Sequence, residues 1–141
     1  MCKDMNMYSK LSKKAVKWIH KSIADCIFHH QYSVGMFFNS KELRSLFADG
    51  VQDFIKNIYG CNEIECITHS SIATSIKLTN GSVIDLFNVD GSPNWKARRY
   101  ACIIYDKSID KLYVNNLIKR LRVCFERNGE DLSKIYEIKF K

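Results

Sequence analysis

Three stretches of the chain repeat apolar residues every three or four positions, which is the spacing of an amphipathic helix. This pattern predicts helices over residues 8–29, 39–59 and 108–128. Asn39 and Glu42 give the second helix a capping-box-like start, because Asn39 can accept from a helix amide while Glu42 reaches back to the Asn39 amide. Gly60 and Gly129 follow the second and third helices, where a left-handed residue is preferred. Both glycines are therefore expected to end a helix.

Shorter apolar runs between these helices are typical of β-strands. We expect extended segments at residues 32–38, 64–89, 100–105 and 136–140. The run YACIIY should be a strand buried on both faces. Within the second segment, SIKLTNGSVIDLF predicts a β-hairpin with Asn80-Gly81 in a tight type I′ turn. The order α-β-α-β-β-β-α-β predicts an α/β fold with one mixed, partly parallel sheet, flanking helices and one hairpin.

The composition fits a single globular domain over residues 1–141. Hydrophobic residues make up 46% and charged residues 26%, which argues against disorder. No apolar run approaches the roughly 20 residues that cross a bilayer, and the start MCKDMNMYSK lacks the apolar core of a signal peptide. The six cysteines show no disulfide-framework spacing. We therefore expect a cytoplasmic protein with reduced thiols and no membrane partner.

The net charge points to a polyanionic partner. The chain carries 22 Lys and Arg against 15 Asp and Glu, a formal charge of +7. A row of lysines falls opposite the apolar stripe of the first helix: Lys10, Lys13, Lys14, Lys17 and Lys21. We expect no acid to compensate this row, which predicts binding to the phosphates of a nucleic acid. The alternative is a solvated lysine face that keeps the protein soluble.

A second basic group is expected in the loop WKARRY, where aromatic and basic side chains are neighbours: Trp95, Lys96, Arg98, Arg99 and Tyr100. Aromatic faces can stack on bases while arginines hold phosphates, which suits single strands or distorted duplexes. In the alternative, Trp95 packs under the loop and the arginines pair with acids such as Asp90. The cations of the third helix should spread around it without forming a site: Lys119, Arg120, Arg122 and Arg127.

Candidate metal and catalytic groups are less specific. A zinc site would draw on cysteines and histidines whose spacing is not that of a standard zinc motif: Cys26, His29, Cys61, Cys66 and His69. A metal nuclease would need Asp85 or Asp106 beside Glu137 and Lys139, but a whole helix separates Asp106 from Glu137. No serine lies in a nucleophile elbow. We predict no catalytic residue, no metal and no cofactor, with enzymatic activity open as an alternative.

The order of parts over residues 22–121 carries a resemblance to a known family. A helix is followed by the strand GMFFNSKE, a long helix, the hairpin SIKLTNGSVI, a basic loop ahead of ARR, and the strand ACIIYDK. This order resembles the ATPase core of phage DNA-packaging terminase large subunits, a P-loop fold. The resemblance implies a phage or other mobile element as the setting, and it aligns the phosphate loop with AVKWIHKS and a magnesium carboxylate with Asp106.

The aligned phosphate loop departs from the pattern of that family. The pattern G-x-x-x-x-G-K-[ST] needs glycines that let backbone amides close around phosphates, and Ala15 and His20 stand in their places. This segment is expected to form a continuous helix instead. Lys107 stands where the family has its catalytic glutamate, and a lysine cannot activate water. The resemblance therefore implies a truncated, degenerate scaffold that does not work as an ATPase.

Together these features predict a non-catalytic phage or mobile-element protein that binds nucleic acid or a host nucleic-acid-handling complex. Inhibition of a host defence nuclease, as anti-CRISPR proteins do, is one form of this prediction. Two alternatives stay open. One is an enzyme, either a residual terminase-like ATPase or a metal-dependent nuclease. The other is an interaction subunit whose basic faces meet an acidic protein surface.

Overall fold

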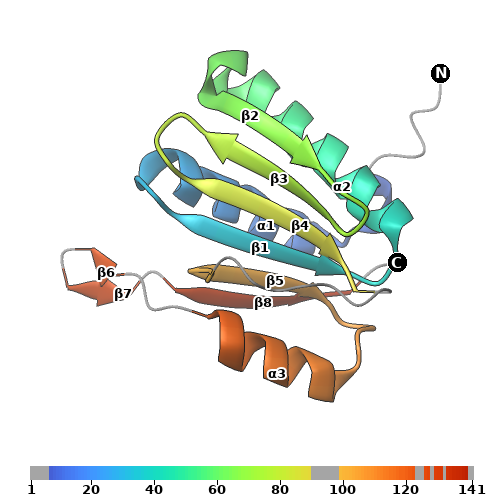
Figure 1. The fold of residues 1–141 in the computed structure, drawn as a ribbon. Helices are drawn as coiled ribbons and strands as arrows, with labels where there is room; N and C mark the ends of the chain where they lie inside the picture. Colours follow the sequence, from blue (N-terminus) through green and yellow to red (C-terminus); the bar gives the residue numbers. More distant parts are fainter. Residues whose placement is uncertain (1–6, 90–98, 123–125, 128, 132, 140–141) are drawn as a thin grey trace.

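The computed structural model describes residues 7–89, 99–122, 126–127, 129–131 and 133–139. Six strands form one sheet in the spatial order β2-β3-β4-β1-β5-β8 (Figure 1). Its strands are β1 (Ser33–Phe38), β2 (Ile64–His69), β3 (Ala73–Leu78), β4 (Val83–Asn88), β5 (Cys102–Asp106) and β8 (Lys134–Ile138). The α-helices are α1 (Lys13–Phe28), α2 (Lys41–Phe54) and α3 (Lys111–Leu121). Shorter elements are the 3-10 helices η2 (Met7–Lys10) and η4 (Cys61–Glu63), the π-helix η3 (Ile55–Tyr59), and the hairpin of β6 (Glu126–Arg127) and β7 (Glu130–Asp131).

One half of the sheet is parallel and the other is antiparallel. Strand β1 pairs in parallel with β4 and β5, and β5 pairs in parallel with β8. Strands β2, β3 and β4 are consecutive and antiparallel. The predicted α/β class with one mixed sheet is confirmed. The predicted hairpin is present as β3 and β4. A second hairpin, which was not predicted, joins β2 and β3, because the chain also reverses at Ser70, whose hydroxyl accepts from the amides of Ile72 and Ala73.

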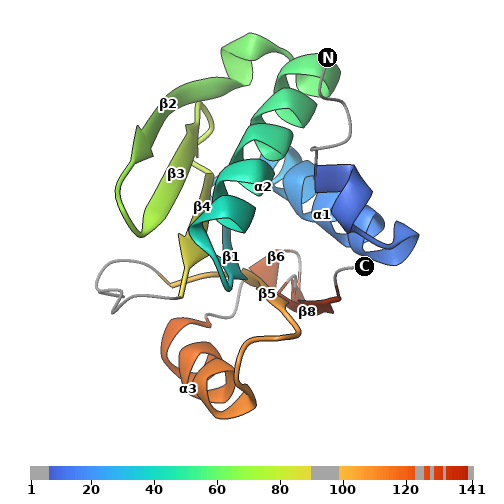
Figure 2. The same ribbon diagram turned by 90° about the vertical axis from the view of Figure 1, so that its right-hand side faces the viewer.

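Strand β1 is buried on both faces. Val34, Met36 and Phe38 pack with residues of α1 and α2, which cover the same face of the sheet (Figure 2). Between them, Gly35 faces the α3 side, where an added Cβ would lie 2.8 Å from the ring of Tyr100. A side chain at this position would displace that ring. The hollow left by the glycine therefore seats a tyrosine against the middle of the sheet.

Serine side chains cap α1 and α2. The amide of Ala15 donates to Ser12 Oγ at 3.2 Å, so α1 begins after η2 instead of continuing from the first predicted residue. At α2 the amide of Leu43 donates to Ser40 Oγ, also at 3.2 Å. The predicted cap at Asn39 is wrong by one residue, because Ser40 has the extended backbone of a cap and its oxygen reaches the helix amide.

The C-terminal third of the chain departs most from the predicted pattern. Helix α3 is capped by Asp110, which accepts from the amide of Tyr113 at 3.1 Å, and it ends at Leu121 well before residue 128. Gly129 has a φ of 80° and lies in the turn between β6 and β7. A left-handed glycine serves a tight turn as well as a helix end, so the residue type did not separate the two. Strand β8 begins at Lys134, ahead of its predicted start.

The turn between β3 and β4 also differs from the prediction. A type I′ turn needs positive φ at both central residues, and of Asn80 and Gly81 only the glycine has one, at 88°. The loop closes through hydrogen bonds of Leu78 with Gly81 at 3.1 Å and with Ser82 at 2.8 Å, which makes a three-residue connection. The Asn80 side chain donates instead to the last carbonyls of α1. The hairpin thereby caps a helix that precedes it by about fifty residues.

Replacing Asn80 with alanine is expected to lower the free energy of unfolding by about 1–3 kcal/mol, because the partly buried carbonyls of Cys26 and Ile27 lose their donor. Thr79→Ala is the matched control in the same loop, since Thr79 is exposed and should cost less than about 0.5 kcal/mol. Urea unfolding followed by circular dichroism measures both. Equal costs for the two substitutions would contradict the capping role of Asn80.

Candidate nucleic-acid interface

Four exposed lysines line the solvent side of α1, and we call them the α1 lysine row: Lys13, Lys14, Lys17 and Lys21. On the opposite side of the helix, Ala15, Ile19 and Ile23 are fully buried against the sheet. The amphipathic spacing of the sequence produces both faces together. Lys10, the first lysine predicted for this row, lies ahead of the helix in η2.

The α1 lysine row is compensated at its C-terminal end. Lys21 Nζ lies 2.9 Å from Asp25 Oδ1, one helical turn further on. This hydrogen bond raises the pKa of Lys21 above its ordinary value. The prediction that no acid compensates the row is therefore wrong for Lys21. Within the described part of the chain, no acid forms an ion pair with Lys13 or Lys17.

The start of α1 is an unfavourable place for lysines. Lys13 and Lys14 are the first two residues of the helix, where the helix dipole favours acids, and its first turn contains no acid. Lys13 and Lys17 are also like charges one turn apart, which destabilises an isolated helix by a few tenths of a kcal/mol. The Nζ of Lys14 lies 5.0 Å from the centroid of the Trp18 ring, a cation–π contact that offsets part of this cost. Helix stability does not explain the row.

The structure describes two residues of the second predicted basic group, Arg99 and Tyr100. Outside the described residues lie Trp95, Lys96 and Arg98. Arg99 is exposed, and its carbonyl accepts from Ser33 Oγ at 3.1 Å. Tyr100 is only 2% exposed, and its ring packs over Gly35, so the prediction that it stacks on a base is wrong. A glycine inside an apolar strand is the sequence signal of such a close approach.

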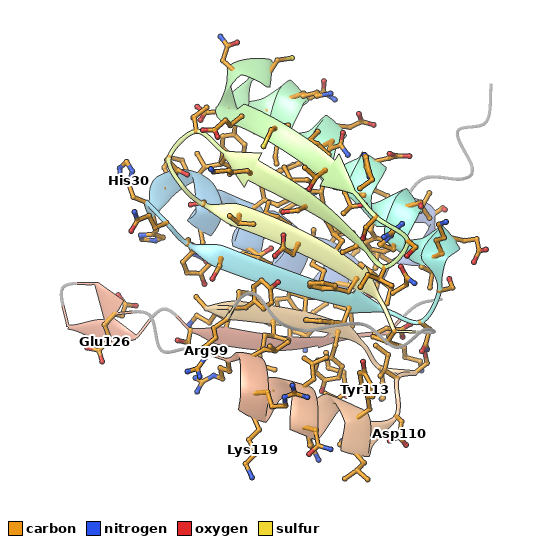
Figure 3. All side chains as sticks on the ribbon, viewed as in Figure 1. His30, Arg99, Asp110, Tyr113, Lys119 and Glu126 are labelled. Carbon is orange, nitrogen blue, oxygen red and sulfur yellow. The ribbon has the colours of Figure 1, made fainter. Side chains whose placement is uncertain are left out.

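A basic surface that was not predicted lies on α3. Its exposed cations are Lys111, Lys119 and Arg120, together with Arg122 at the C-cap. Residues 111–122 contain no acid, which is the sequence signal that could have indicated this surface. Lys119 points away from the sheet (Figure 3). Because α3 is shorter than predicted, Arg127 belongs to β6 and not to the helix. The last turn of α3 keeps two adjacent cations, Lys119 and Arg120.

The carboxyl ends of the parallel strands β1, β5 and β8 meet at one edge, where α/β sheets commonly bind ligands. Asp106, at the end of β5, is 2% exposed and accepts from the amide and hydroxyl of Ser108 at 2.9 and 2.8 Å. Asn39 Nδ2 lies 3.5 Å from the other Asp106 oxygen and also bonds to Ser108 Oγ. A pocket of about 270 Å³ here is lined by Asp106, Lys107, Ser108 and Lys139. The carboxylate of Asp106 thus fixes the turn between β5 and α3.

The carboxylates of the metal-nuclease alternative do not come together. Side chains alternate along β5, so Asp106 lies on the face that packs against α1. Glu137 of β8 accepts from Tyr105 Oη at 3.0 Å on the α3 face. Asp85 lies within β4 and accepts from Tyr100 Oη at 2.6 Å. Among the described residues, no three His, Cys, Asp or Glu side chains gather closely enough to hold a metal ion.

The segment aligned with the phosphate loop is helical. Ala15, His20 and Lys21 all belong to α1, so the predicted continuous helix is confirmed. Amides inside a helix bond to carbonyls one turn back and cannot close around a phosphate. His20 instead stacks on Phe54 of α2, with ring centroids 3.9 Å apart. Burial lowers the pKa of His20 below its ordinary value.

The described cysteines are free thiols in two environments. Cys26 and Cys102 are buried, whereas Cys61 and Cys66 are exposed. Burial raises the pKa of the Cys26 and Cys102 thiols well above the ordinary range. A raised pKa depletes the thiolate, which is the reactive form, at neutral pH. The two buried thiols should therefore be inert until the protein unfolds.

No family model, no curated protein and no solved structure matches the chain. The evidence for a function therefore comes from the geometry of the site. Every helix in the described residues is too short or too polar to span a bilayer.

Iodoacetamide at neutral pH is expected to modify Cys61 and Cys66 in the native protein and to spare Cys26 and Cys102, because burial and a raised pKa protect the latter pair. Peptide mass spectrometry after timed exposure reports each site.

Reductant should leave the melting temperature of the protein unchanged. A fall of more than about 5 °C, which corresponds to roughly 1 kcal/mol, would contradict the prediction that the cysteines form no structural disulfide.

We expect no hydrolysis of ATP above background, because the amides that would hold its phosphates lie inside α1 and Lys107 cannot activate water. Release of inorganic phosphate in the presence of magnesium is the measurement. Turnover that disappears in an Asp106→Ala variant with an unchanged circular dichroism spectrum would contradict this expectation.

Proposed function

We propose that this chain is a non-catalytic nucleic-acid-binding protein that docks the α1 lysine row on a phosphate backbone. The observation that carries the proposal is the pair Lys13 and Lys17, exposed one turn apart and without an ion-pair partner in the described part of the chain. These lysines make the helix less stable, so a ligand that needs them accounts for them better than solubility does.

The dimensions of the α1 lysine row suit a nucleic-acid strand. From Lys13 to Lys21 the helix rises about 12 Å, at 1.5 Å per residue. Phosphates of one B-form strand are about 3.4 Å apart along the duplex axis, so the row covers about three or four of them. Trp18 of the same helix stacks on Tyr136 of β8, with ring centroids 5.0 Å apart and 14° between their planes. This contact helps to hold the helix on the sheet.

A phage or other mobile element is the proposed setting, with the host cytoplasm as the location. The resemblance to the terminase ATPase core supports this setting. The helical phosphate-loop segment and the separated carboxylates support the absence of catalysis in this proposal. In a host cell, the same row could reach nucleic acid held by a defence nuclease, which would make the chain an inhibitor of the anti-CRISPR kind.

Charge reversal at Lys13 and Lys17 together is expected to weaken nucleic-acid binding at least about tenfold. The slope of log affinity against log salt concentration should fall by the equivalent of about two phosphate contacts. Stability should change by no more than about 0.5 kcal/mol per substitution, because both side chains are exposed. Fluorescence anisotropy with labelled DNA and RNA duplexes of random sequence, at several salt concentrations, measures affinity and slope.

The matched control for this variant is Lys41→Glu with Lys56→Glu, which makes the same change in net charge at exposed positions of α2 and η3. It should keep most of the affinity. Equal losses in the two double variants would mean that net charge alone attracts the ligand. An unchanged affinity of the Lys13→Glu, Lys17→Glu variant for nucleic acid would contradict the proposal and assign the row to solubility. Tight binding of the wild-type protein to an acidic protein, with no binding to nucleic acid, would favour the interaction-subunit alternative.

A further inference from the structure

Helix α3 carries a small pocket on its surface, which we call the α3 pocket. Its volume is about 170 Å³, and the described residues that line it follow one stripe of the helix: Tyr113, Asn116, Leu117, Arg120 and Leu121. Leu117 and Leu121 are buried and make an apolar floor, while Asn116 and Arg120 are exposed at the rim. The pocket therefore combines an apolar interior with an amide and a guanidinium at its mouth.

The size of the α3 pocket suits one aromatic ring. A protein cavity of about 150 Å³ is known to hold benzene, whereas drug-sized ligands occupy sites of about 300–1,000 Å³. Tyr113 contributes an aromatic ring to the wall, and the amide of Asn116 and the guanidinium of Arg120 can bond to polar atoms on the edge of a heterocycle. A single six-membered heterocycle thus fits this pocket better than a whole nucleotide does.

The cations around the α3 pocket favour a ligand with a negatively charged backbone. Lys119 and Arg122 flank Arg120 along the helix, and all three are exposed. The described residues provide no ion-pair partner for any of them. Asp110, the acid at the start of α3, accepts from the amide of Tyr113. Cations beside a ring-sized pocket are the combination by which proteins hold unpaired bases, with charge on the phosphates and stacking on the base.

We infer that the α3 pocket receives one unpaired base of a single-stranded nucleic acid, with Lys119 and Arg122 on the neighbouring phosphates. A base inside a duplex is paired and stacked, and it can enter a pocket only after extrusion. The ring-sized volume favours a pyrimidine over a two-ring purine. This inference rests on the proposed function for its nucleic-acid partner, but it uses a helix on the opposite face of the sheet from α1 (Figure 2).

Two adjacent asparagines provide a matched pair of variants. Asn115 and Asn116 are both exposed, and of the two only Asn116 lines the pocket. Asn116→Leu narrows the mouth and removes the amide without changing the charge, and Asn115→Leu makes the same change beside the pocket. Fluorescence anisotropy would use two labelled probes, an oligothymidylate and an abasic strand of equal length, which share their phosphates and differ in their bases.

The wild-type protein is expected to bind the oligothymidylate at least about fivefold more tightly than the abasic strand, the range that one stacked base supplies. Asn116→Leu should abolish this difference, and Asn115→Leu should preserve it. Equal binding of both probes by the wild type, or equal effects of the two leucine variants, would overturn the inference. Lys13→Glu with Lys17→Glu should lower both affinities by one common factor. The ratio between the two probes therefore tests the pocket separately from the α1 lysine row.

Discussion

Burial of β1 on both of its faces is the constraint on which the rest of the structure depends. Val34, Met36 and Phe38 need cover from α1 and α2, while Phe37 belongs to the core under α3. Parallel pairing with β4 and β5 removes any free edge of the strand. Helices must therefore pack on both faces of the sheet. Their polar sides point outward in opposite directions, which is why this small fold presents two separate helical surfaces.

Elements whose signal is spread over many residues could be predicted from the sequence, whereas their ends could not. The apolar stripe of α1 and the continuous apolar run of β1 indicate a helix and a buried strand without reference to the rest of the chain. The cap of α2 is harder, because Asn39 and Ser40 are adjacent and both are good caps. What separates them is distant in sequence, since the side chain of Asn39 bonds to Asp106 and Ser108 instead.

The candidate site likewise has some features that the sequence predicts and others that it does not. Exposure of the α1 lysine row follows from helical spacing, so it could be expected from the sequence alone. The burial of Tyr100 depends on the hollow at Gly35 in a neighbouring strand, and the separation of Asp106 from Glu137 depends on the register of β5 with β8. Register between strands is a long-range property that a local pattern does not contain. The α3 pocket was missed for a related reason, because its place depends on where the helix ends.

The distribution of acids explains how a chain of moderate net charge supports two basic helices. Asp85 and Asp106 are buried, and each accepts a hydrogen bond from inside the protein, whereas Asp25 is buried within α1 and accepts from exposed Lys21. Among the described Lys and Arg residues, only Arg44 is comparably buried. Asp85 and Asp106 count in the formal charge of +7, but they lie in β4 and β5 and form no ion pair with the exposed cations of α1 or α3 among the described residues. Because the sheet lies between α1 and α3, charge changes on α1 alter the overall attraction for phosphates without altering the α3 pocket, so any preference of that pocket for a base should persist.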